Sequence, residues 1–228
     1  MSTYTTAVFG EAPVIRVLRL AADAQWSAGR LDVDDELARL DRTVRFSPEA
    51  SWAMPMSTLA ALLELIADIL EADPAHDTPP AFRAALERAT EGAEGTEGTD
   101  PPGYLRTLAA RIRRRADARH VGVRELPLVR WEVEALFPRL EAVAWQCRMV
   151  REHPTFTECA QAAIESEHPA YCPEFLSTIA AEAQRLLLLF PAPEPLPENT
   201  PTLHWADREV ARELLTLATD HMTRHHQD

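Results

Sequence analysis

The chain of 228 residues contains 46% hydrophobic and 26% charged residues and carries a formal net charge of −13. This length and hydrophobic content suffice for a buried core and exclude a wholly disordered chain. The acidic balance disfavours binding to nucleic acid, because like charges repel.

The chain has no uninterrupted apolar run near the roughly 18 residues that a membrane-spanning helix needs. The longest candidate, residues 59–70, is broken by Glu64 and Asp68. The N-terminal sequence MSTYTTAVFGEAP lacks the positive start and the apolar stretch of a signal peptide. We therefore predict a cytoplasmic protein with no membrane association. Its three cysteines, an odd number, argue against a disulfide framework and indicate free thiols, metal ligands or small buried residues.

Helical periodicity is the main secondary-structure signal. Apolar residues recur three, four and seven positions apart in segments such as 14–22 and 62–70. No segment alternates polar and apolar residues over five or more positions, and the chain has only seven glycines. We predict an all-α protein, a bundle of about eight or nine helices with no sheet.

Capping residues, prolines and glycines delimit the predicted helices. Asp32 precedes a helix whose first turn contains Asp34, Asp35 and Glu36, and carboxylates stabilise a helix N-terminus. We prefer this capping role to a magnesium site. The helix over 128–152 must tolerate or kink at Pro138. The predicted helices are residues 13–28, 33–44, 57–72, 79–90, 104–119, 128–152, 154–166, 169–190 and 203–221.

Two segments between the helices have a distinct composition. Residues 91–103, EGAEGTEGTDPPG, form a predicted flexible acidic loop, and residues 191–201, PAPEPLPENTP, a predicted stiff proline-rich connector. We predict a single helical domain over residues 1–228 that carries both. The alternative is a pair of helical subdomains, 1–90 and 104–228.

The predicted helix over 104–119 is unusually basic. Eight arginines lie between Tyr104 and Trp131, and apolar residues form one face of the helix while arginines occupy the rest. Such a helix can bind an acidic protein partner, the phosphates of a nucleic acid, or carboxylates of its own chain. The candidate partner-binding residues are Arg106, Arg111, Arg113, Arg114, Arg115 and Arg119.

A stretch rich in cysteine and histidine follows. A structural zinc ion takes four nitrogen or sulfur ligands, and residues 147–172 offer five such side chains. Compact zinc motifs use tight pairs such as C-x2-C, whereas successive cysteines here lie twelve and thirteen residues apart. The candidate zinc or iron ligands are Cys147, His153, Cys159, His168 and Cys172.

A repeated Glu-His-Pro sequence, at 152–154 and 167–169, offers another explanation of the same residues. Proline is favoured at the first position of a helix, and the residue before it is kept out of helical geometry. The repeat then marks two helix starts, with Phe156 and Tyr171 anchored in the core and Cys159 buried. From sequence alone we prefer this interpretation to a metal site.

A second histidine group, His221, His225 and His226, lies at the C-terminus. His221 and His225 are four residues apart and would share one face of a helix. Terminal segments usually fray, so we expect only adventitious metal binding there. The Glu-x-x-His sequence of di-iron bundles occurs once, at residues 165–168, where two copies are needed.

Catalytic motifs are missing from the sequence, which has no G-x-S-x-G, no phosphate-binding loop and no dinucleotide fingerprint. We predict a non-catalytic binding or adaptor protein, without a cofactor, that recognises a protein partner through its arginine-rich helix. One alternative is a helical protein that binds zinc or iron through residues 147–172. Another is a subunit of a nucleic-acid-associated complex. The oligomeric state is left open.

Overall fold

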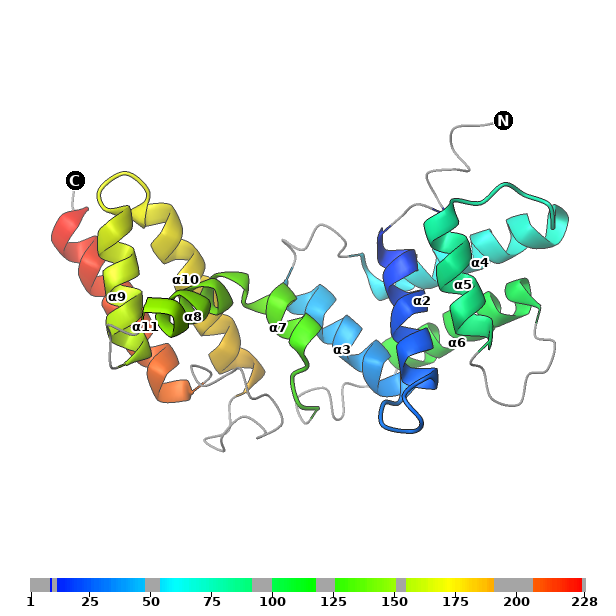
Figure 1. The fold of residues 1–228 in the computed structure, drawn as a ribbon, viewed down its shortest axis with the longest axis horizontal. Coiled ribbons are helices and arrows are strands. Elements are labelled where there is room, and N and C mark those ends of the chain that lie inside the picture. Colours follow the sequence, from blue (N-terminus) through cyan, green and yellow to red (C-terminus); the bar gives the residue numbers. More distant parts are fainter. Residues whose placement is uncertain are drawn as a thin grey trace. The chain divides into compact units, whose positions relative to one another are not determined.

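The computed structural model of the protein describes residues 9, 12–47, 54–91, 100–117, 126–150, 155–190 and 207–226. Within these residues there are ten helices, α2–α11, and no strand. The all-α prediction is confirmed, and the helix count exceeds the predicted eight or nine. The chain divides into two compact units, residues 1–126 and 127–228 (Figure 1). The alternative division predicted at 91–103 falls inside the first unit.

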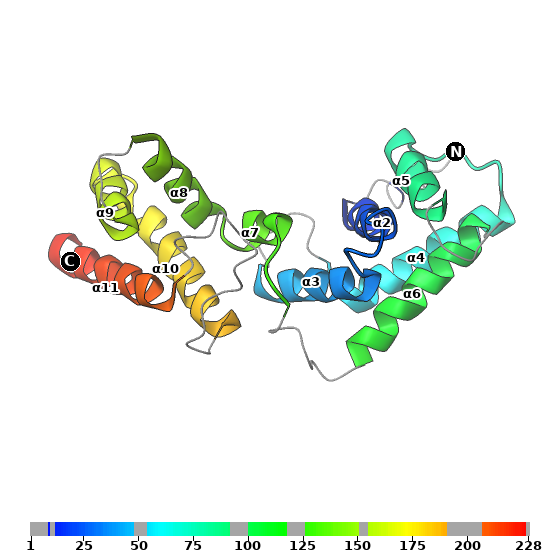
Figure 2. The ribbon, with the colours of Figure 1, turned by 60° about the horizontal axis from the view of Figure 1, so that its bottom comes forward.

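The first unit packs its helices in pairs. α4 and α6 lie side by side along most of their length, and α2 packs against α3 and α5 (Figure 2). The shared apolar faces of α4 and α6 include Leu63, Ile66, Leu105 and Ile112, all fully buried. The helices of this unit are α2 (Ala12–Gln25), α3 (Val33–Phe46), α4 (Met56–Ala72), α5 (Pro80–Glu91) and α6 (Pro101–Asp117).

Acidic side chains set the starts of two of these helices. The Asp32 carboxylate accepts hydrogen bonds from the N–H groups of Asp34 (2.7 Å) and Asp35 (3.2 Å) at the start of α3, the capping role that the sequence indicated. At α6 the Asp100 carboxylate accepts a hydrogen bond from the Gly103 N–H (3.1 Å). Residues 101–103 are therefore helical, not part of a flexible loop. Residues 92–99 of that predicted loop lie outside the described residues.

The described residues of the second unit also form five helices. α10 and α11 pack along each other, and α9 contacts α8, α10 and α11. The single kinked helix predicted over 128–152 is in fact two, because Pro138 begins a new helix and Phe137 before it has non-helical backbone angles. The helices of this unit are α7 (Arg130–Leu136), α8 (Pro138–Val150), α9 (Phe156–Glu167), α10 (Cys172–Leu189) and α11 (Arg208–His225).

A buried carboxylate caps the N-terminus of α8. Glu182, on α10, is 2% exposed and accepts hydrogen bonds from the N–H groups of Arg139 (3.0 Å) and Leu140 (2.8 Å). Burial raises the pKa of the Glu182 carboxyl to about 7, although the two N–H donors lower it. The carboxyl thus ties α10 to the start of α8.

The second copy of the Glu-His-Pro repeat, residues 167–169, does not start a helix as predicted. α10 begins at Cys172, and Pro169 lies in the turn before it. Tyr171 is 66% exposed, so it is not anchored in the core. α9 has a cap of its own, because the hydroxyl of Thr155 accepts a hydrogen bond from a backbone N–H in the first turn (3.2 Å). Pro154 lies outside the described residues.

The last helix begins later and extends further than predicted. Its cap is Asp207, whose carboxylate accepts a hydrogen bond from the Glu209 N–H (2.6 Å), and it continues to His225. The proline-rich segment 191–201 and residues 202–206 lie outside the described residues. No helix in the described part of the chain is both long enough and apolar enough to cross a membrane.

Candidate metal centre

The five predicted metal ligands separate in the structure. Cys147 on α8 and Cys159 on α9 form a disulfide, with their Cα atoms 5.8 Å apart. This corrects the prediction that the cysteines are unpaired: the α8–α9 hairpin brings together two residues twelve apart in sequence. His153 lies outside the described residues. His168 and Cys172 remain, one on each side of the turn between α9 and α10.

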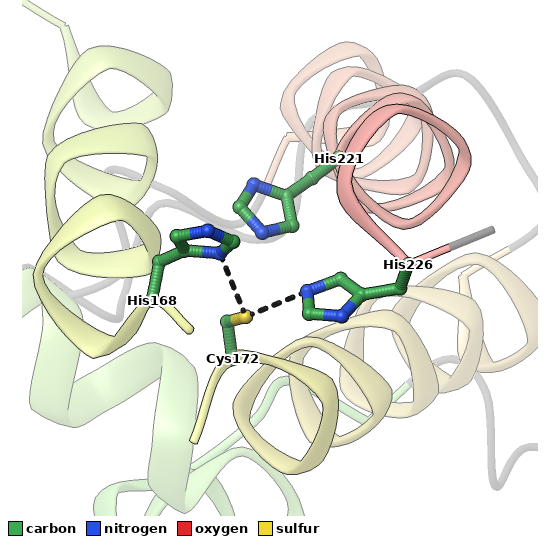
Figure 3. Close-up of side chains that lie close together, drawn as sticks. All are labelled: His168, Cys172, His221 and His226. Carbon is green, nitrogen blue, oxygen red and sulfur yellow. Dashed lines mark hydrogen bonds between the residues drawn. The ribbon is translucent and has the colours of Figure 1, made fainter. Parts of the chain in front are cut away.

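Two C-terminal histidines join that pair. One ligand atom from each of His168, Cys172, His221 and His226 lies within 4.8 Å of all the others (Figure 3). The sulfur of Cys172 is 2.9 Å from Nε2 of His226 and 3.4 Å from Nδ1 of His168. We call these four residues the CysHis3 cluster.

Helix ends hold the cluster in place. His168 follows the last residue of α9 and donates its N–H to the Glu165 carbonyl (3.3 Å), while His226 follows α11 and donates to the Met222 carbonyl (3.0 Å). Cys172 is the first residue of α10. The C-terminal ends of helices favour positive charge, and the N-terminal ends favour negative charge. Histidines at two C-terminal ends and a cysteine at an N-terminal end suit a cation bound to a thiolate.

One nitrogen of the cluster lacks a hydrogen-bond partner among the described residues. Cys172 is fully buried. The Nε2 atom of His221 is shielded from solvent and has no hydrogen-bond partner among the described residues. A buried nitrogen without a partner is costly.

Electrostatics keep His221 in the form that binds metals. Burial lowers the pKa of His221, and the neighbouring imidazoles of His225, His168 and His226 lower it further, while Glu165 raises it. A metal ion binds the neutral imidazole, so no proton must leave this ring before it coordinates.

The donor spacing is close to that of a tetrahedral zinc site. Bonds of about 2.0–2.1 Å to nitrogen and about 2.3 Å to sulfur place neighbouring donors roughly 3.3–3.6 Å apart. The separations from Cys172 to His226 and His168, 2.9 and 3.4 Å, lie near this range. The remaining donor separations are no larger than 4.8 Å.

The predicted arginine surface lies on α6, where three of its members pair with carboxylates of the same unit. Arg106 forms ion pairs with Asp68 (2.8 Å) and Glu71, both on α4. Arg113 forms one with Glu64, also on α4, and this hydrogen bond lowers the pKa of the Glu64 carboxyl. Much of the positive charge on α6 is therefore matched by α4.

The other predicted arginines form weaker ion pairs or none among the described residues. Arg111 lies 3.8 Å from Asp34 on α3. No carboxylate in the described part of the chain forms an ion pair with the side chain of Arg114, which is exposed, or of Arg115. Arg119 lies outside the described residues. Partner binding through α6 stays a prediction.

The sequence analysis missed His221 and His226 as partners of His168 and Cys172. The available signal was the four-residue spacing from His168 to Cys172 together with a histidine group near the chain end. These segments are about 50 residues apart, and only the packing of α11 on α10 and α9 brings them together.

Comparison with known proteins finds no match, whether with protein-family models, curated proteins or solved structures. No function can therefore be inferred for this chain from a similar protein. A functional assignment depends on the geometry of this chain alone.

Proposed function

We propose that this protein binds one transition-metal ion, zinc, through the CysHis3 cluster. The observation that carries the proposal is the convergence of four metal-ligating atoms from two distant segments within 4.8 Å. One of the four residues, His221, has a shielded nitrogen with no hydrogen-bond partner among the described residues. A metal ion at the centre would satisfy that nitrogen and the buried sulfur of Cys172 at once.

The ligand types favour zinc. Imidazole nitrogen suits zinc, copper, iron and nickel, while thiolate selects copper(I), zinc and iron–sulfur clusters. The cluster contains no carboxylate, which hard cations require. Four protein ligands fill a tetrahedral zinc ion and leave no open position, so the site is of the structural kind.

A bound ion would fasten α11 to the turn between α9 and α10. His221 and His226 belong to the end of α11, and His168 and Cys172 flank the turn. Structural zinc sites contribute roughly 10–16 kcal/mol of apparent binding free energy, which becomes folding free energy where the empty site is not formed. The metal would thus hold the end of the second unit together.

Cobalt substitution tests the proposal on the full-length, untagged chain. Co²⁺ in a tetrahedral site with a thiolate ligand has strong visible absorption and a thiolate-to-metal charge-transfer band. We expect both on titration of the apo protein, and we expect zinc to abolish them. Cys172→Ala should remove the charge-transfer band.

A matched control uses the other cysteines. The double variant Cys147→Ser/Cys159→Ser removes the disulfide and should keep the spectrum of the wild type. His226→Ala, which leaves all three cysteines in place, should weaken cobalt binding. An unchanged spectrum in Cys172→Ala and His226→Ala would overturn the proposal, as would a wild type that does not saturate.

A further inference from the structure

A pocket opens beside the CysHis3 cluster, between α9 and α11. Its volume is about 480 Å³. Two members of the cluster, His168 and His221, form part of its wall, so the pocket reaches the proposed metal site directly. The other lining residues that matter for its chemistry are Glu165, Asp220, Arg224 and His225.

His225 lines this pocket beside His168 and His221 of the cluster. Its ring centroid is 4.8 Å from that of His221 and 5.0 Å from that of His168. The His225 side chain is exposed, whereas Cys172 is fully buried. It is not one of the four residues whose ligand atoms lie within 4.8 Å of one another. His225 is therefore a fourth imidazole, and would be a fifth ligand, at the edge of a complete ligand set.

The charges of the pocket favour a cation. The carboxylate of Glu165 is exposed and lines the pocket together with His168 and His221 of the cluster. Asp220 forms an exposed ion pair with Arg224 (3.3 Å). The Glu165 carboxylate accepts a hydrogen bond from the neutral amide of Gln161 (2.9 Å).

We infer that the metal ion is taken up and released through this pocket, and that His225 is a relay ligand that holds the ion outside the CysHis3 cluster. This inference rests on the proposed function. Cys172 is buried, whereas His225 and the cluster member His168 are exposed in the pocket. A hydrated ion therefore meets these two imidazoles, with water still bound, before it reaches the thiolate. Zinc expands from four to five ligands with little cost, so the ion passes from His225 to His168 and His221 without being fully released. The site is then an exchangeable zinc site.

The consequence is kinetic. A relay ligand lowers the barrier in both directions, because it stabilises the state between free and bound ion. Its removal slows uptake and release by similar factors and leaves the equilibrium affinity nearly unchanged. Loss of a member of the cluster does the opposite and raises the dissociation constant.

Stopped-flow kinetics on the full-length, untagged chain test the relay. Zn²⁺-loaded protein is mixed with excess 4-(2-pyridylazo)resorcinol, and apo protein is mixed with Zn²⁺. We expect His225→Ala to slow uptake and release by about tenfold each, within the range by which local fields and encounter groups alter rates. The dissociation constant should change by less than about threefold, or about 0.7 kcal/mol.

Thr223→Ala is the matched control. Thr223 is exposed on the same helix turn but does not line the pocket, so both rates should equal those of the wild type. Glu165→Gln should slow uptake at low salt only, because salt screens an exposed charge. Wild-type rates in His225→Ala would overturn the relay, and so would a large loss of affinity at an unchanged uptake rate. A wild type that binds no zinc would instead refute the proposed function itself.

Discussion

The arginine-rich face of α6 and the CysHis3 cluster use polar side chains in opposite ways. On α6, positive guanidinium groups meet negative carboxylates of the same unit, and Arg106 and Arg113 each pair with residues of α4. In the cluster all four side chains offer electron pairs to a cation. One of its nitrogens, Nε2 of His221, has no hydrogen-bond partner among the described residues.

This difference shows which of the two unusual groups of residues indicates an external ligand. The run of arginines is conspicuous in the sequence, yet the fold supplies many of the opposite charges. The histidines are scattered in the sequence, and among the described residues the fold gathers them with a thiol into a ligand set that contains no carboxylate. An external ligand is indicated where packing leaves like groups together, and here we propose that this ligand is a metal cation.

Removal of a cluster histidine should have the largest effect. An apparent binding free energy of about 10–16 kcal/mol shared by four ligands gives roughly 3–4 kcal/mol for each, or about 10²–10³-fold in affinity. We therefore expect His221→Ala to raise the zinc dissociation constant by that factor, measured by competition with a chelator of known affinity. His225→Ala, one turn away on the same helix, is the matched control. Equal affinities for the two variants would remove the distinction between cluster and relay.

Glu182 extends the comparison to a buried carboxyl group. Unlike Nε2 of His221, it has hydrogen-bond donors within the chain, the N–H groups of Arg139 and Leu140. Burial raises its pKa in the folded state to about 7, from an ordinary 4.5. Between these values the folded protein holds a proton that the unfolded chain has lost. Stability that is fully present below pH 4.5 is then lost as the pH rises through 7. The expected loss is about 3 kcal/mol, at 1.36 kcal/mol per pKa unit.

Denaturant unfolding at a series of pH values from 4.5 to 8 measures this loss. Glu182→Gln, which keeps an oxygen to accept from the start of α8, should show a flatter profile than the wild type. The difference between the two profiles removes the contribution of the histidines, which both share. Parallel profiles would show that the carboxyl does not titrate in this range.

Reduction of the disulfide distinguishes the stability that this covalent cross-link contributes from the stability that a bound metal contributes. Cys147 and Cys159 are twelve residues apart, and closing a loop of this size contributes roughly 2–3 kcal/mol. Reduction should lower the free energy of unfolding by that amount without loss of bound zinc, measured by denaturation and metal analysis of the same sample. Loss of zinc in step with reduction would mean that these sulfurs take part in the metal site. Disulfides are commoner in oxidising compartments, whereas the cytoplasmic location remains a prediction from sequence.

The smallest effect is expected on α6. Arg106→Gln and Arg113→Gln remove exposed ion pairs, which contribute little because solvent screens them. The unfolding midpoint should fall slightly, and less so at high salt. Ile112→Ala on the buried face of the same helix should cost about 2–5 kcal/mol, since it leaves a cavity. A large effect of the arginine variants would show that these pairs hold α4 and α6 together.

Local signals made parts of this structure predictable. Asp32 predicted the start of α3. The spacing of apolar residues in α4 and α6 predicted which faces of these helices are buried. Pro138 was recognised as unfavourable inside a continuous helix. Whether it kinks that helix or begins a new one depends on tertiary packing. In this fold it begins α8, whose first N–H groups meet the Glu182 carboxylate from α10.

The candidate metal centre was only half predictable. His168 and Cys172 are four residues apart and were recognised as possible ligands. Their partners lie about 50 residues away on a helix that packs against α10, and sequence spacing carries no information on such a contact. The same limit explains why Cys147 and Cys159, expected as ligands, are joined to each other across a hairpin.

The metal content of the untagged protein tests the central claim most directly. The full-length chain is purified without chelators and analysed for metals beside His221→Ala and Cys147→Ser/Cys159→Ser. We expect about one zinc ion per chain, the stoichiometry of a single four-ligand site, in the wild type and in the double cysteine variant, and much less in His221→Ala. Absence of stoichiometric metal from the wild type, or equal zinc in His221→Ala, would contradict the assignment of the CysHis3 cluster as a metal site.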